Sequence, residues 1–125
     1  MDENKLSYEV VGAAIEVHKQ LGPGLLESVY HQCLHRELKL RGLDVKSEVP
    51  IGASYKGVDI DTAYRMDLLV TDKLVLELKV VDRLAAVHEA QLLSYLRLSG
   101  KKLGLLINFN VPVLKEGIKR VVNNL

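Results

Sequence analysis

Apolar residues recur at helical spacing through the first third of the chain. They lie on one face from Leu6 to Leu21 and again from Leu26 to Leu38, which predicts two amphipathic helices. Gly22 and Pro23 separate the two, because glycine adopts the left-handed conformation that ends a helix and proline blocks its continuation. Gly24 is expected to open the second helix and Gly42 to end it.

The pattern then changes to that of β-strands. Leu43–Ile51 alternates between apolar and polar residues and predicts a strand, which Pro50 restricts. Tyr55–Val58 is typical of a turn between strands. Two short apolar strands follow, and the polar tripeptide Thr71–Lys73 between them indicates a β-hairpin.

The last third of the chain predicts two further helices around one strand. Arg83–Ser99 has a helical apolar stripe that Gly100 ends, and Leu103–Phe109 is a short apolar run typical of a buried strand. Val113–Val122 has an amphipathic helical pattern. The predicted order is α-α-β-β-β-α-β-α. Because a helical crossover follows an antiparallel hairpin, we expect an α/β fold with a central mixed β-sheet flanked by α-helices.

The predicted hairpin carries charges on otherwise aliphatic strands. Side chains alternate faces along a strand, so Glu77 and Lys79 share one face of the second strand. A three-residue loop would place Asp67 opposite Glu77, where like charges about 5 Å apart repel. A two-residue loop would shift this register. Facing carboxylates need a cation between them, or one must keep its proton. The alternatives are a divalent-metal site beside Lys79 or ordinary salt bridges on an edge strand.

Three other polar positions each have a plain structural explanation as well as a functional one. Glu27 borders the apolar stripe of the second helix, where an acid also interacts well with the helix dipole. His31 and His35 have a spacing that can chelate zinc, but no second ligand pair is near, which favours a solvated or partly buried helix face. Gln91 lies within the stripe of the third helix, either hydrogen-bonded inside or reaching water at its edge.

Composition limits the classes of protein to consider. The chain has 125 residues, 48% hydrophobic and 26% charged, with a net charge of +1, as expected for one soluble domain over residues 1–125. This balance gives no global reason to expect nucleic acid. One cysteine, Cys33, excludes an internal disulfide and fits a reducing compartment. No signal peptide or bilayer-spanning apolar segment is evident, so we expect a cytoplasmic protein with no membrane partner.

The hairpin motif Asp67…Glu77-Leu78-Lys79 matches the D…(D/E)xK signature of restriction-endonuclease-like nucleases. It occurs with further motifs, namely Gly24-x-x-Glu27-x-x-Tyr30, Tyr55-x-Gly57, Tyr64-Arg65-Met66-Asp67, His88-x-x-Gln91-x-x-x-Tyr95 and Gly104-x-x-x-Asn108-Phe109. From about Leu6 to Val122, this series resembles the bacterial GxxExxY proteins of the PD-(D/E)XK nuclease superfamily. Met66 replaces the proline that usually precedes the first aspartate.

The resemblance implies a restriction-endonuclease-like core and a set of site residues. The implied Mg²⁺ or Mn²⁺ ligands are the carboxylates of Glu27, Asp67 and Glu77 and the backbone carbonyl of Leu78; Lys79 would act on the attacking water, with Gln91 beside the site and Tyr30 and Tyr95 supporting it. Hard oxygen ligands suit these ions better than zinc.

The function that this resemblance implies is metal-dependent hydrolysis of phosphodiester bonds, of DNA rather than RNA. Two other classes stay open. One is a nucleic-acid-binding or regulatory module with the same fold and an idle metal site. The other is a structural or protein-interaction subunit. The small size of the chain leaves little surface for gripping a duplex, and a homodimer would enlarge that surface.

Overall fold

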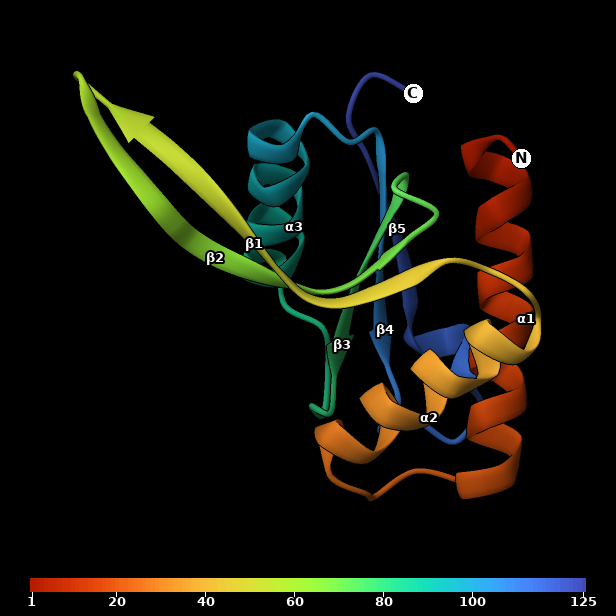
Figure 1. Cartoon of the computed structure of the whole chain (residues 1–125). Coiled ribbons are helices and arrows are strands. Elements are labelled where there is room, and N and C mark those ends of the chain that lie inside the picture. Colours follow the sequence, from red (N-terminus) through yellow and green to blue (C-terminus); the bar gives the residue numbers. More distant parts are fainter.

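The computed structural model describes residues 1–125 and contains one five-stranded sheet with helices on both faces (Figure 1). The elements are α1 (Glu3–Leu21), α2 (Glu27–Leu40), β1 (Val45–Tyr55), β2 (Val58–Val70), β3 (Leu74–Lys79), α3 (Ala86–Ser99), β4 (Leu103–Asn108), the 3₁₀ helix η1 (Leu114–Gly117) and β5 (Ile118–Val122). The strands lie in the order β1-β2-β3-β4-β5, with β3 and β4 parallel and the other neighbours antiparallel. The predicted mixed sheet flanked by helices is confirmed.

The two faces of the sheet bury two separate apolar clusters. Leu74, Leu76 and Leu78 pack with the apolar stripes of α1 and α2 on one face. Val75 packs on the opposite face, with Leu92 and Leu96 of α3. The alternation of side chains along β3 therefore places this strand between the two helical layers, which accounts for its nearly continuous apolar sequence.

The β2–β3 hairpin has a three-residue loop, the first of the two alternatives that the sequence leaves open. Val70 pairs with Leu74 across Thr71–Lys73, and the amide of Lys73 donates a hydrogen bond of 3.0 Å to the Val70 carbonyl. The predicted turn at Tyr55–Val58 is also present, with Lys56 and Gly57 at positive φ angles of 46° and 85°.

The outer parts of β1 and β2 form a two-stranded arm, residues 50–64. Its base packs on α3 through Ile51 and Tyr64, and its tip projects beyond the helices (Figure 1). The two strands pair with each other as far as Tyr55 and Val58. Apolar side chains are exposed near the tip, where Tyr55, Val58 and Ile60 are 65%, 61% and 45% exposed. No helix in the structure has the length and apolar character needed to cross a membrane.

The helix predicted over Val113–Val122 is wrong. Only Leu114–Gly117 is helical, as a short 3₁₀ turn, and Ile118–Val122 is a strand antiparallel to β4. Ile118 and Val121 have helical spacing, but β4 would expose unpaired backbone groups without this neighbour. Gly117 permits the close approach, because a Cβ there would clash with the carbonyl oxygen of Asn108. The third helix also begins at Ala86, later than the predicted Arg83.

Candidate active site

Asp67 and Glu77 meet where the backbone pairing of the β2–β3 hairpin ends. The last backbone pair is Leu68 with Leu76. Beyond this pair, carboxylate side chains replace backbone carbonyls as hydrogen-bond acceptors. The Leu78 amide donates to Asp67 Oδ2 at 2.8 Å, and the Asp67 amide donates a longer bond of 3.4 Å to Glu77 Oε1. The two carboxylates therefore lie together between the strands, each held by the backbone of the other strand.

Both β1 and β2 are irregular at this row. Met66 packs on the α3 side of the sheet and Leu68 on the opposite side, although residues two apart in a regular strand share a face. On β1, Val45 likewise packs on the α1 and α2 side and Val49 on the α3 side, although residues four apart in a regular strand share a face. Between these two lies Glu48, whose φ of 54° is uncommon for a residue other than glycine. The irregularity brings Glu48 into the site.

Tyr30 holds the segment that leads to Glu27, the first residue of α2. Its hydroxyl donates to the Gly22 carbonyl at 2.6 Å and accepts a bond of 3.1 Å from the Leu25 amide. Its fully buried ring stacks on Phe109, with ring centroids 4.5 Å apart. These contacts fix the start of α2 against the core, although Glu27 itself lies at an exposed rim.

Glu27 and Asp67 line the same polar pocket, which has a volume of about 400 Å³. Partial desolvation raises the pKa of Glu27, and the negative charge of Asp67 raises it further, whereas Lys79 and His31 oppose the change. Glu27, Asp67 and Lys79 are therefore electrostatic neighbours, although they come from α2, β2 and β3.

Glu77 is the most strongly perturbed acid of the site. It is only 6% exposed, and burial raises its pKa to about 9, with further contributions from the charge of Asp67 and a hydrogen bond to it. Lys79 lowers the pKa but does not cancel these effects. Without a cation, Glu77 therefore keeps its proton at neutral pH.

Asn108 holds the chain that follows Lys79. Lys79 pairs with Asn108 of β4, and the Lys79 carbonyl accepts a 3.0 Å bond from the Phe109 amide. The buried Asn108 side chain donates to the Val81 carbonyl at 2.8 Å and accepts from the Val81 amide at 3.1 Å. A buried amide at the end of an apolar strand was the sequence signal for this role, which our sequence analysis did not assign.

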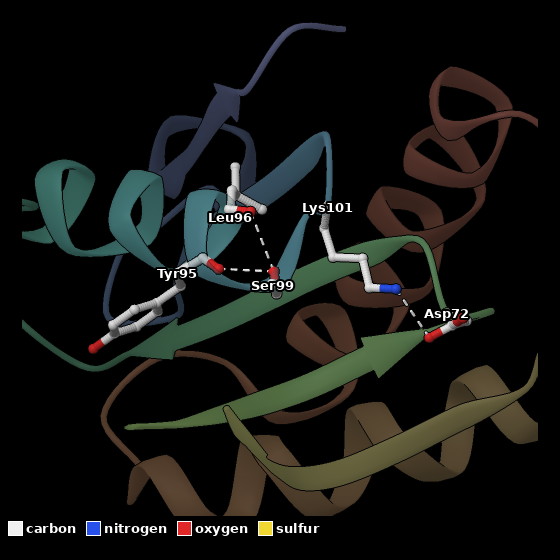
Figure 2. Close-up of polar contacts among 5 residues, drawn as sticks. All are labelled: Asp72, Tyr95, Leu96, Ser99 and Lys101. Atoms are coloured by element: carbon white, nitrogen blue, oxygen red, sulfur yellow. Dashed lines mark hydrogen bonds and ion pairs between the residues drawn. The ribbon is translucent and has the colours of Figure 1, made fainter. Parts of the chain in front are cut away.

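Tyr95 of α3 lies on the Glu77 side of the sheet. Its ring stacks on Tyr64 at 3.7 Å, and the Tyr64 hydroxyl donates to the Tyr95 carbonyl at 2.7 Å. Ser99 donates to the same carbonyl at 2.7 Å (Figure 2). Burial raises the pKa of Tyr64 to about 12 and also raises that of Tyr95, and the charge of Glu77 contributes to both. Gln91, one turn before Tyr95, is exposed, and its side chain forms no hydrogen bond with another protein group.

Glu48 is a site residue that the sequence did not indicate, and His31 is one for which the sequence favoured a solvated or partly buried helix face. One ligand atom from each lies within 4.8 Å of the other and of an Asp67 oxygen. His31 is half-buried, in line with the partly buried face expected for it, but it faces the pocket. Its position one turn after Glu27 could have indicated this. Nothing in the sequence marks the backbone conformation of Glu48. His35 is not part of the group.

Comparisons with known proteins identify the superfamily of this chain. The sequence matches the PD-(D/E)XK nuclease superfamily over residues 4–121, so the chain belongs to that superfamily. A crystal structure of the protein SSO0001 is similar in fold, with a TM-score of 0.60 and 20% identity. The match covers 78% of this chain and 50% of that protein, so this chain spans half of its length. A search of curated proteins finds no match.

The donor set fits a hard divalent cation. The predicted ligands Glu27, Asp67 and Glu77 carry carboxylate oxygens, which Mg²⁺ and Mn²⁺ prefer. The group whose ligand atoms lie within 4.8 Å of one another contains Asp67 with His31 and Glu48, and neither Glu27 nor Glu77. Two facing carboxylates repel each other unless one is protonated or a cation lies between them. Without a cation, the raised pKa of Glu77 keeps it protonated and so relieves this repulsion. Superfamily membership also favours a divalent metal. Leu78 follows Glu77 directly in β3, and its amide donates to Asp67.

Proposed function

We propose that this protein is a metal-dependent nuclease that hydrolyses phosphodiester bonds, of DNA rather than RNA, and that it is a GxxExxY-type member of the superfamily acting as one domain. The observation that carries the proposal is the meeting of Asp67 with the buried Glu77 at the end of the hairpin ladder. Glu27 and Lys79 are close enough to influence the charges there.

Each residue has a distinct role in this proposal. Glu27, Asp67 and Glu77 hold Mg²⁺ or Mn²⁺, together with the Leu78 carbonyl. A bound ion supplies a nucleophile near neutral pH and stabilises charge on the phosphate. Lys79 orients the attacking water or offsets the developing negative charge.

The remaining roles support these ligands. Tyr30 fixes the start of α2 and so the position of Glu27. Gln91 and Tyr95 flank the site from α3. The exposed amide of Gln91 is free to contact a substrate, because no other protein group binds it.

The test is cleavage by the purified full chain. Labelled single- and double-stranded DNA and RNA are incubated with Mg²⁺ or Mn²⁺, and we expect DNA products that a chelator abolishes. Asp67→Ala, Glu77→Ala and Lys79→Ala should each lower the rate by about 100-fold or more, the scale for removing one charge-stabilising group. Asp59→Ala, on the exposed arm, is the matched acidic control and should cleave normally. Absence of cleavage with both ions on every substrate would contradict the proposal.

A second candidate function is favoured by the arm. Exposed Tyr55, Val58 and Ile60 near its tip suit contact with another protein, including a second copy of this chain. An interaction subunit would show stable association without cleavage. A nucleic-acid-binding module would instead bind without metal and without product, with an affinity that falls as salt rises.

A further inference from the structure

The pocket beside the hairpin acids has an entirely polar lining. Its walls come from α2, β1 and β2, and the residues are Glu27, Ser28, His31, Gln32, Glu48 and Asp67. Within it, ligand atoms of His31, Glu48 and Asp67 all lie within 4.8 Å of one another. Ligands around a transition metal at about 2.0–2.3 Å are separated by about 3–4.5 Å. Small side-chain rotations would therefore bring all three onto one ion.

His31 and Glu48 have no other partners that would prevent this. His31 Nδ1 is 3.9 Å from Glu48 Oε1, which is too long for a hydrogen bond. Neither side chain forms a hydrogen bond elsewhere in the structure. The Asp67 carboxylate accepts from the Leu78 amide through Oδ2 and also hydrogen-bonds Glu77, which leaves further lone pairs on its two oxygens. The imidazole of His31 and the carboxylates of Glu48 and Asp67 thus have lone pairs that can coordinate one ion in the pocket.

We propose that His31, Glu48 and Asp67 form a second divalent-cation position, adjoining that of Glu27, Asp67 and Glu77 and sharing Asp67 with it. The imidazole nitrogen makes this position select Mn²⁺ over Mg²⁺, because Mg²⁺ prefers an all-oxygen octahedron whereas transition metals accept nitrogen. The proposal adds a second cation to the proposed nuclease site. A catalytic role for this cation rests on the proposed nuclease function, whereas binding of the cation does not.

The test is electron paramagnetic resonance of the metal-free full chain titrated with Mn²⁺. We expect two ions per wild-type chain and electron spin echo modulation from a coordinated ¹⁴N nucleus. His31→Gln should lose the nitrogen modulation and one ion. Glu48→Gln should weaken the same ion by about 10-fold or more, as loss of a metal-supporting group does. Glu77→Gln should lose the other ion and keep the nitrogen signal.

His35→Gln is the matched control, because His35 lies one turn further along α2, is also half-buried and is outside the group. It should behave as wild type. Absence of Mn²⁺ binding or of nitrogen modulation in the wild-type protein, or its persistence in His31→Gln, would overturn the proposal.

DNA cleavage measured on the same samples separates the two proposals. Cleavage without nitrogen modulation would refute this cation position and leave the nuclease assignment standing. Nitrogen modulation without cleavage would support the cation position and contradict the nuclease.

Discussion

Replacing Glu77 by glutamine should stabilise the metal-free protein, in a way that depends on pH. The pKa of Glu77 rises from an ordinary value of 4.5 to about 9 in the folded chain, first because it is buried and then because Asp67 is negatively charged. Between these two pH values the folded state binds a proton that the unfolded state has lost. The free energy of unfolding therefore falls as pH rises through this window. Glutamine keeps the shape of the protonated acid and removes the titration.

The pKa shift sets the size of the effect. Each pH unit inside the window is worth up to 1.36 kcal/mol. Between pH 4.5, the ordinary pKa, and pH 7, the free energy of unfolding of the wild-type protein falls by up to about 3 kcal/mol through this titration. Glu77→Gln has no such loss. The difference should grow towards pH 9 and vanish near pH 4.5. This is a large fraction of the ~5–15 kcal/mol that stabilises a typical domain.

Urea unfolding followed by circular dichroism, with a chelator present and at pH 5, 6, 7 and 8, measures this difference. Glu116→Gln is the control, because Glu116 is exposed and does not line the pocket that contains Asp67. It should follow the wild-type pH dependence. The reasoning is refuted if Glu77→Gln is no more stable than wild type at pH 8, or if the difference between them does not change with pH.

Two further predictions concern the same site. Tyr30→Phe removes the hydroxyl that bonds to Gly22 and Leu25. It should lower stability by about 1–3 kcal/mol, because two partly buried hydrogen bonds of about 0.5–1.5 kcal/mol each are lost. It should also weaken Mn²⁺ binding, because Glu27 is less firmly placed. The control Tyr8→Phe, on the exposed face of α1, should change neither the stability nor the Mn²⁺ affinity, both measured by calorimetry. Mn²⁺ affinity should rise up to about 10-fold per pH unit below pH 9, because Glu77 must release its proton. Calorimetry at pH 7 in buffers of different ionisation enthalpy should detect about one proton released, and none in Glu77→Gln.

The sequence alone predicted the hairpin and left two registers open, one of which is the observed one. Alternation along Leu74–Val81 and the polar tripeptide before it are local signals, and side-chain faces follow from them directly. The conflict between Asp67 and Glu77 could be seen for the same reason. The structure adds that Asp67 and Leu78 bond to each other where the ladder stops.

Other features depend on contacts between distant segments. No local pattern brings Glu27 beside the hairpin; only the family resemblance indicated it. Glu48 enters the pocket through a positive φ that no glycine marks. The last strand was missed because Ile118 and Val121 have helical spacing, while the neighbouring β4 edge determines their conformation. Tertiary pairing outweighs local propensity in such short segments.

The most direct test of the site is a crystal of this protein soaked in Mn²⁺ and measured for anomalous scattering. The account predicts a peak bound by carboxylate oxygens of Glu27, Asp67 and Glu77 at about 2.1–2.3 Å, with the Leu78 carbonyl as a further ligand. A fully occupied crystal with no peak among these three acids, or one in which Glu27 points away from the ion, would contradict it.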